Sequence, residues 1–188
     1  MQVIETKLSG VLIIEPKIFG DSRGFFEETW NKARYEAIGI KGEFVQDNLS
    51  YSTKGVLRGL HYQYPHAQGK LLSVAKGEVF DVAVDIRVGS PTFGQWEGVL
   101  LSGENHRQLW IPAGFAHGFC VTSDTVYFTY KCTDAFTPEA EGGVLWNDPD
   151  IGIEWPLGDV GLSDKDKVYS RLQDIPEARL PKFSEFGG

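Results

Sequence analysis

The sequence predicts an all-β protein, and three observations support that class. The 22 glycines and 9 prolines are spread along the 188 residues rather than gathered in one tract, which suits many short strands joined by tight turns. Residues 79–86 alternate, with Phe80, Val82 and Val84 on one face and Asp81 and Asp85 on the other, and this period of two is typical of a strand. Similar short runs recur between Gly, Pro, Asn and Asp residues, which indicates a sandwich or a barrel.

The same patterns give the expected elements in chain order. Strands are expected at residues 11–15, 44–51, 56–62, 70–75, 79–86, 96–101, 108–111, 117–121 and 125–130. A helical pattern is present only at residues 31–38, with a short turn near residues 162–168. No internal repeat, linker or charge block marks a boundary, so the length predicts one domain over residues 1–188.

The composition excludes several classes of function. A formal net charge of -8 argues against general nucleic-acid binding, which depends on a surplus of Lys and Arg. The sequence has no run of 18 apolar residues, and the N-terminus lacks the basic and apolar regions of a signal peptide, so we expect a cytoplasmic protein that does not enter a membrane. In that compartment Cys120 and Cys132 are expected to be reduced.

The first group of residues with possible chemistry surrounds His61. On a regular strand, Arg58 and Leu60 would face the opposite side from Leu57, Gly59 and His61, and a bulge near Gly59 would change that assignment. A single histidine on a strand is more often a hydrogen-bonded core or rim residue than a catalytic one. His61 is therefore a candidate whose role depends on its neighbours.

The second group is a P-x-G-x-x-H pattern made by Pro112, Gly114 and His117. It resembles the second motif of the cupins, in which the histidine is a metal ligand. The partner motif of a metal-binding cupin offers two histidines two residues apart, whereas this chain has His61 followed by Tyr62 and Gln63. One imidazole alone is a poor site for Zn²⁺ or Fe²⁺. We therefore expect a cupin-type fold without a metal, with His117 left for structure or ligand contact.

Longer stretches resemble one cupin family, the dTDP-4-dehydrorhamnose 3,5-epimerases. The matching stretches are residues 19–28, 44–48, 55–63, 68–71, 77–87, 111–119 and 145–149. The resemblance implies an antiparallel cupin-type jelly-roll barrel with a few short helices. It also implies a cofactor-free isomerase of dTDP-rhamnose biosynthesis that inverts carbons 3 and 5 of dTDP-4-dehydro-6-deoxy-D-glucose to give dTDP-4-dehydro-L-rhamnose.

The resemblance also assigns catalytic roles. His61 is expected to remove a proton next to the ketone, Tyr130 to donate one on the opposite face of the sugar, and Lys70 to stabilise the enolate. These residue types suit the roles, because histidine titrates near neutrality, a phenol can donate a proton, and an ammonium group is a compact charge for an oxyanion. Without the resemblance, Tyr130 would be read as a core aromatic.

A carboxylate beside His61 would fix its tautomer and stabilise the imidazolium formed during turnover. The resemblance favours Asp166, and Asp85 on the strand at residues 79–86 is the alternative. The polar composition of residues 163–167 is equally compatible with a solvated surface.

The nucleotide requires a local basic and aromatic surface on this acidic protein. Arg23, Arg58 and Lys165 are candidates for the charge, and Phe26 and Phe136 for flanking the base. The remaining contacts implied by the resemblance are Glu28, Gln46, Asp47, Asn48, His117 and Glu141. Phe26 could instead be an ordinary core residue. At the position of Phe136 the family often has tyrosine, so this chain keeps the ring for stacking but lacks the hydroxyl.

A homodimer is expected for two reasons. The strand at residues 11–15 would otherwise leave an exposed sheet edge, and the resembled family places Arg23 and Phe26 near the neighbouring subunit's site. Two other functions stay open. One is a mono-epimerase or 3,4-ketoisomerase on a related dTDP-sugar, and the other is a non-catalytic cupin that binds a sugar nucleotide. The joint presence of His61, Lys70 and Tyr130 favours an enzyme, since binding alone needs no acid and base.

Overall fold

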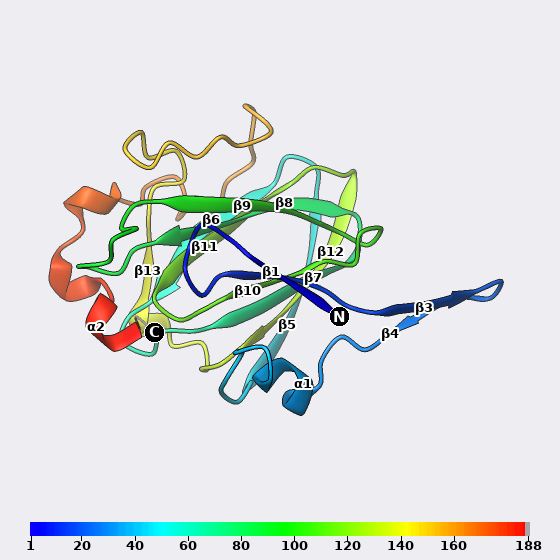
Figure 1. The fold of residues 1–188 in the computed structure, drawn as a ribbon. Helices are drawn as coiled ribbons and strands as arrows, with labels where there is room; N and C mark the ends of the chain where they lie inside the picture. Colours follow the sequence, from blue (N-terminus) through cyan, green and yellow to red (C-terminus); the bar gives the residue numbers. More distant parts are fainter. Residues whose placement is uncertain (187–188) are drawn as a thin grey trace.

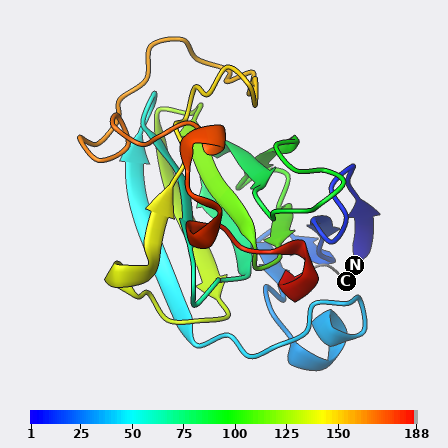
Figure 2. The same cartoon turned by 90° about the vertical axis from the view of Figure 1, so that its left-hand side faces the viewer.

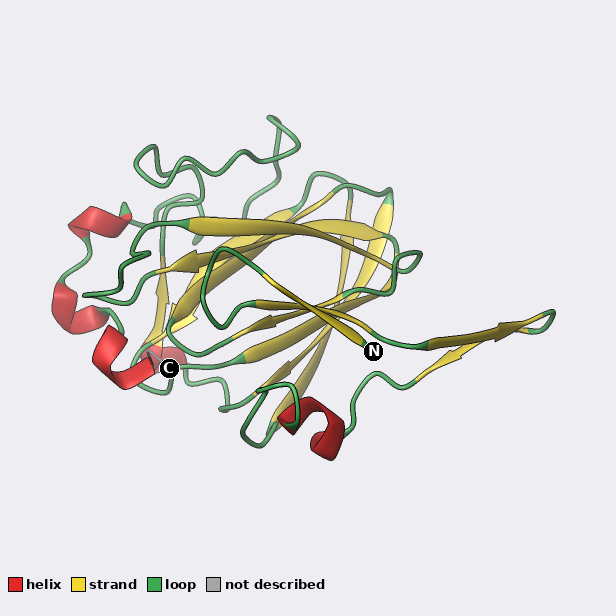
Figure 3. Cartoon of the chain, in the orientation of Figure 1, coloured by secondary structure: helices red, strands yellow, loops and turns green. Residues whose placement is uncertain are grey.

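The computed structural model describes residues 1–186 and confirms the predicted antiparallel all-β fold (Figures 1 and 3). One sheet has the order β1 (Gln2–Glu5), β2 (Leu12–Glu15), β10 (Gln108–Ile111), β7 (Lys70–Lys76), β12 (Thr125–Cys132) and β5 (Gln46–Thr53). The facing sheet has the order β13 (Glu141–Gly143), β6 (Leu57–Gln63), β11 (Phe115–Val121), β8 (Glu78–Asp85) and β9 (Trp96–Ser102). A separate hairpin, β3 (Ile18–Asp21) and β4 (Gly24–Glu27), projects from the body in Figure 1.

The helical segments are short. The helix expected at residues 31–38 is α1 (Lys32–Glu36), and the side chain of Asn31 caps it by accepting a hydrogen bond from the Arg34 N–H at 3.2 Å. Residues 162–168 form turns without a helix. The other helical segments are η1 (Pro138–Ala140), η2 (Leu172–Asp174), η3 (Glu177–Arg179) and α2 (Phe183–Phe186). Across residues 1–186, none of the helices is long and apolar enough to cross a membrane.

The strand expected at residues 11–15 is β2, but it is not a sheet edge. It pairs with β10 on one side and with β1 on the other. The prediction that residues 11–15 form an exposed sheet edge was therefore wrong. The edge of the six-stranded sheet on this side is β1, and all four of its residues are exposed; the opposite edge is β5. An exposed strand edge is open to pairing with another chain unless something covers it.

The main core fills the space between the two sheets. Leu72 and Val74 of β7 and Phe128 of β12 meet Phe119 of β11 and Leu101 of β9, and the rings of Phe119 and Phe128 lie 4.4 Å apart. Complete burial of a side chain of this size contributes about 1.5–3 kcal/mol. This cluster therefore holds the two sheets together.

The alternation of β8 is as expected, but both of its faces are buried. Val82, Val84 and Ile86 belong to a second cluster that also contains Leu172 and Leu180 of the C-terminal segment. This segment is orange to red in Figure 2 and lies in front of the strands there. The opposite face of β8 carries two apolar members of the main core together with Asp81 and Asp85. The more polar face therefore points into the barrel.

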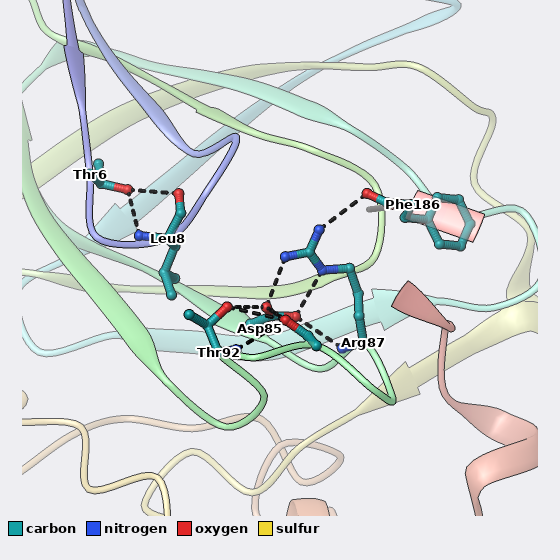
Figure 4. Close-up of polar contacts among 7 residues, drawn as sticks. Thr6, Leu8, Asp85, Arg87, Thr92 and Phe186 are labelled. Atoms are coloured by element: carbon teal, nitrogen blue, oxygen red, sulfur yellow. Dashed lines mark hydrogen bonds and ion pairs between the residues drawn. The ribbon is translucent and has the colours of Figure 1, made fainter. Parts of the chain in front are cut away.

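Asp85 lies at the centre of a buried hydrogen-bond network (Figure 4). Arg87 donates to its two carboxylate oxygens at 2.9 and 2.8 Å, and the hydroxyls of Ser90 and Thr92 each donate at 2.6 Å. Arg87 also donates to the backbone carbonyl of Phe186 at 3.1 Å. Burial alone would raise the pKa of Asp85, but these hydrogen bonds outweigh it and the pKa lies below its usual range. The network ties the C-terminal segment to the end of β8.

Candidate active site

A bulge in β6 brings His61 and Arg58 to the same face of the sheet. His61 lies opposite His117 of β11, whereas Arg58 lies opposite Phe119, so β6 has one residue more than β11 between the two pairs. Directly paired residues point to the same side, and the regular alternation that separated Arg58 from His61 is therefore wrong here. Gly59 lies within the bulge at φ 128°, where an added Cβ would lie 2.5 Å from a Cα atom of β11. Only glycine fits that approach.

His61 forms a close pair with Asp166. Nε2 of the imidazole lies 2.6 Å from Oδ1 of the carboxylate, and Asp166 is only 2% exposed. Burial would raise the pKa of Asp166, but hydrogen bonds from His61, Ser163 and the backbone of Gly59 outweigh it, so the pKa lies below its usual range. Of the two carboxylates predicted as partners of His61, Asp166 contacts it. Asp85 instead accepts hydrogen bonds from Arg87.

The turn that carries Asp166 is part surface and part interior. Its neighbours Asp164 and Lys167 are exposed and pair with each other at 3.0 Å, as the solvated-surface interpretation expected. Asp166 departs from that interpretation because its side chain points inward. Its backbone N–H donates to Ser163 Oγ at 3.1 Å, which holds the turn in this shape.

His61 opens onto a cavity of about 300 Å³ at one end of the barrel. The cavity receives side chains from both sheets and from the loop after β12. It is lined by Gln46, Asn48, His61, Tyr62, Gln63, Gln68, Lys70, Tyr130, Cys132, Phe136 and Glu141. His61 enters from β6 of the five-stranded sheet, while Lys70 and Tyr130 enter from β7 and β12 of the other sheet. A molecule bound between them would therefore face His61 on one side and Tyr130 on the other.

Lys70 and Tyr130 lie side by side on this wall. The Lys70 ammonium lies 5.5 Å from the centre of the Tyr130 ring. Burial lowers the pKa of Lys70. Burial also raises the pKa of Tyr130, with a further increase from nearby Cys132, so the phenol keeps its proton at neutral pH. Tyr130 packs against the main core as well as lining the cavity, so the core interpretation describes only part of its surroundings.

A second cavity, of about 570 Å³, begins on the other side of His61. Arg58, Lys165, Ser163 and Asp166 are among its lining residues. The Lys165 ammonium lies 2.7 Å from a carboxylate oxygen of Glu141, which lines the first cavity. The two cavities are thus adjacent and share His61, and the second one has two cationic side chains in its wall.

Phe136 is held at the mouth of the first cavity by its backbone. Its N–H donates to Gln46 Oε1 at 2.8 Å, and the following N–H, of Thr137, donates to Gln63 Oε1 at 2.8 Å. The residue is 51% exposed. An aromatic face that is fixed in direction and open to solvent can stack on a planar ligand.

Three predicted contact residues lie outside both cavities, near the projecting hairpin. Arg23 has an 87% exposed side chain and pairs with Asp21 at 2.6 Å. Phe26 is 69% exposed, so the core interpretation of this residue is wrong. Glu28 follows the hairpin and pairs with Arg34 at 3.0 Å. None of the three reaches the cavities within the described chain, residues 1–186.

Asp47 and His117 also lie apart from the two cavities. Asp47 alternates with Gln46 and Asn48 on β5, so it faces the outside and pairs with Lys131 at 2.9 Å. His117 is 8% exposed, and its Nε2 lies 3.0 Å from the carboxylate of the fully buried Asp81. Burial raises the pKa of Asp81 in spite of this contact. The part of the chain that the structure describes contains no group of three or more His, Cys, Asp or Glu side chains placed to hold a metal ion.

Four residues line the first cavity but were not among the predicted site residues: Tyr62, Gln63, Gln68 and Cys132. Cys132 is two residues beyond Tyr130 on β12, so extending the predicted strand by two residues would have placed its thiol on the same face. Gln63 stands in the same relation to His61 on β6. Gln68 precedes β7 and carried no strand signal. Cys132 and Cys120 are both buried, free thiols.

Comparisons of sequence and of fold relate the chain to one family of known proteins. The family model described as dTDP-4-dehydrorhamnose 3,5-epimerase matches residues 5–174. The dTDP-4-dehydrorhamnose 3,5-epimerase of Shigella flexneri is 62% identical over 168 residues, which cover 88% of this chain and 93% of the relative.

Two crystal structures extend the comparison. The dTDP-6-deoxy-D-glucose-3,5-epimerase of Legionella pneumophila, in complex with dTDP-4-keto-L-rhamnose, is 58% identical with a TM-score of 0.95, covering 96% of this chain and 97% of that one. A 3'-monoepimerase from Streptomyces bikiniensis, in complex with dTDP-quinovose, is 34% identical with a TM-score of 0.88, covering 95% and 92%. The resemblance drawn from the sequence is thereby confirmed, and the chain belongs to the dTDP-4-dehydrorhamnose 3,5-epimerase family.

Proposed function

We propose that this chain inverts carbons 3 and 5 of dTDP-4-dehydro-6-deoxy-D-glucose by proton transfer through an enolate. One observation carries the proposal: His61 and Tyr130 enter the same cavity from opposite sheets, and Lys70 lies beside Tyr130. Inversion at a carbon needs removal of a proton on one face and delivery of a proton on the other. Two groups on facing walls meet that need, whereas binding alone would not require them.

His61 acts as the base in this proposal. A hydrogen next to a ketone is weakly acidic, and a positioned base contributes about 10² to 10⁴ in rate. When His61 takes the proton it becomes an imidazolium, and the ionised Asp166 at 2.6 Å stabilises that charge. The low pKa of Asp166 supports this role, because the carboxylate stays ionised throughout the neutral range.

Lys70 and Tyr130 complete the reaction on the opposite wall. The electron pair left by the proton moves to the ketone oxygen, where the Lys70 ammonium stabilises the developing negative charge. Tyr130 then donates its phenolic proton to the carbon on the face away from His61. The phenolate takes up a proton from solvent and the His61 imidazolium releases its proton to solvent, which restores both groups. The raised pKa of Tyr130 supports its role as donor, since the phenol is protonated at the start.

The nucleotide is proposed to occupy the second cavity and the mouth of the first. Arg58 and Lys165 offer positive charge to the diphosphate, and the exposed ring of Phe136 offers a stacking surface to the thymine. The complex of the Legionella relative with dTDP-4-keto-L-rhamnose supports a dTDP-linked ligand for this chain.

A homodimer is part of the proposal. Arg23 and Phe26 lie on a hairpin that projects away from the body, and their side chains are exposed. If they contact the nucleotide, as the family resemblance implies, it is the nucleotide bound by a second copy of the chain. The sites would then be shared between subunits.

Incubation with dTDP-4-dehydro-6-deoxy-D-glucose in D₂O tests the chemistry. The wild-type protein should incorporate deuterium at carbons 3 and 5 and invert both, whereas a mono-epimerase would invert one and a binding protein would exchange neither. His61→Ala should abolish exchange at both carbons. Tyr130→Phe should keep exchange, because His61 can return deuterium to the same face, while inversion falls steeply.

Tyr127→Phe is the matched control, because Tyr127 lies on the same strand but outside the cavity. It should retain both exchange and inversion. A well-folded Tyr130→Phe protein that inverts both carbons at the wild-type rate would exclude Tyr130 as the donor.

Mixing two inactive variants tests the shared site. Light scattering should first report about twice the 20.9 kDa chain mass. Arg23→Ala and His61→Ala chains, exchanged into mixed dimers, would form one site with both residues intact and regain activity. Lack of any recovery in verified mixed dimers would show that Arg23 does not serve the neighbour.

A further inference from the structure

The Lys70 ammonium depends on few partners for its charge. Its Nζ lies 2.6 Å from Gln68 Oε1 and 3.8 Å from the sulfur of Cys132. Among the described residues, no carboxylate lies within ion-pair distance of it. An ammonium in a largely buried position loses hydration and therefore tends to release its proton. The nearby acceptor is thus important for keeping it ionised.

We propose that Gln68 is a positioning residue that keeps Lys70 charged and directs its ammonium into the cavity. The carboxamide oxygen is the closest acceptor to Nζ, and a hydrogen bond from an ammonium to a carbonyl oxygen stabilises the charged form. The consequence for catalysis rests on the proposed function, in which Lys70 stabilises the enolate.

The orientation of the Gln68 carboxamide is itself fixed. Its Nε2 donates to the backbone carbonyl of Asp134 at 2.8 Å, so the oxygen and not the amino group faces Lys70. The adjacent backbone is held to the same segment: the Gly69 N–H donates to Thr133 Oγ1 at 2.8 Å, and the Thr133 N–H donates to the Gly69 carbonyl at 3.0 Å. Gln68 therefore offers an acceptor that is preorganised for Lys70.

Two other neighbours also favour the charged form of Lys70: burial lowers its pKa, whereas Cys132, with its sulfur at 3.8 Å, and Glu141 raise it. Burial raises the pKa of the Cys132 thiol in spite of nearby Lys70, so this neighbour stays neutral at neutral pH. Tyr130 on β12 also keeps its proton, and His61 lies across the cavity on β6. Glu141 on β13 is the one carboxylate lining the cavity, and it pairs with Lys165 at 2.7 Å. Gln68 is accordingly the closest support of the Lys70 charge.

Two variants of Gln68 give opposite predictions. Gln68→Met keeps the length of the side chain but removes the acceptor, so the titration midpoint of Lys70 should fall by about one pH unit. Gln68→Glu keeps an acceptor oxygen and adds a negative charge, so the midpoint should rise. Gln95→Met serves as a control, since Gln95 is exposed and lies outside the cavity, and it should leave the midpoint unchanged.

The midpoint is read from the ¹³Cε signals of ¹³C-lysine-labelled full-length protein, in which the Lys70 signal is the one lost in Lys70→Arg. The alkaline limb of the pH profile of turnover is measured in parallel. Opposite shifts of the Lys70 midpoint in the two Gln68 variants support the proposal. Unchanged midpoints, or shifts in the same direction, overturn it, because a merely structural role for Gln68 would not separate the two variants.

The two measurements also separate this proposal from the proposed function. If the midpoints shift in opposite directions and the alkaline limb follows them, both stand. If the midpoints shift and the pH profile does not move, Gln68 still controls the charge of Lys70, but Lys70 is not needed as a cation in the reaction.

Discussion

Replacement of Asp166 by asparagine isolates the charge that faces His61. The asparagine side chain has nearly the same shape, so the turn at residues 163–167 should keep its form, while the imidazolium formed in turnover loses its negative partner. The wild-type pair is close, 2.6 Å between Nε2 and Oδ1, and Asp166 is 2% exposed, so solvent does little to screen it.

The size of the effect follows from that geometry. A hydrogen bond to a charged group contributes about 1.5–3 kcal/mol. Because the charge on His61 develops as the proton is removed, this free energy belongs to the transition state and not to substrate binding. We therefore expect kcat to fall by about 10- to 150-fold, with KM changed little.

The assay follows deuterium incorporation and inversion at both carbons. Exchange and inversion should fall together in Asp166→Asn, because proton removal by His61 precedes both. Ser163→Ala is the comparison, since it keeps the Asp166 carboxylate and removes the hydroxyl that accepts from the Asp166 backbone N–H at 3.1 Å and helps to lower the pKa of Asp166. Because the negative partner of the imidazolium remains, Ser163→Ala should lose less turnover than Asp166→Asn. Wild-type kcat in a folded Asp166→Asn protein, or a loss of inversion with full exchange, would refute the role of Asp166.

Three further outcomes are expected. Asp85→Asn leaves the buried Arg87 without its counter-ion and should lower the free energy of unfolding by about 3–5 kcal/mol in urea titrations at pH 7, while kcat of the folded fraction is unchanged. Because the folded pKa of Asp85 is depressed, its stabilisation is present above the usual value of about 4 and is lost as the pH falls through the folded pKa, so the two proteins should converge in stability in acid. Gly143→Ala places a Cβ 2.2 Å from the ring of Tyr169, and this ring lies 6.0 Å from the His61 ring. The substitution should therefore displace Tyr169 and reduce turnover. Gly158→Ala is the control, because its Cβ would meet nothing within 4 Å, and it should leave turnover unchanged. Dialysis against a strong chelator should leave turnover intact, since the proposed steps use only side-chain acids and bases, and recovery with a single divalent ion after loss would contradict this.

The strands that were predicted from the sequence are those with a buried face. The alternation in β8, β11 and β12 reflects packing between the sheets, and it located these strands to within two residues. Of the missed strands, β1 and β3 have only exposed residues, and β4 is exposed at three of its four positions. The fourth missed strand, β13, has only three residues, and its one buried position is Gly143, which carries no side chain. A strand without a buried face imposes no hydrophobic period on its sequence, so pattern analysis has nothing to detect.

The site was less accessible to pattern analysis than the fold. The face of the sheet to which His61 points depends on a β-bulge. A bulge moves every later residue of the strand to the opposite face, and the hydrophobic pattern of the sequence gives no sign of it. The contact between His61 and Asp166 joins positions 105 residues apart, which no local period can predict. Asp166 was named from family resemblance alone. The position of Cys132, in contrast, can be predicted from the sequence: with β12 extended to residue 132, the period of two places its thiol on the same face as Tyr130.

The inward faces of β7 and β12 combine packing and chemistry along a single line. On β7 the inward positions are Lys70, Leu72 and Val74, and the last two belong to the core between the sheets. On β12 the inward positions Val126 and Phe128 belong to the same core, and Tyr130 follows next to Lys70. The polar end and the apolar end of each strand therefore share one face, and the boundary between them is where the Phe128 and Tyr130 rings lie 5.9 Å apart. Because the backbone holds the cavity end of each strand in register with a close-packed core, the same hydrogen-bonded strands provide both stability and the positioning of Lys70 and Tyr130.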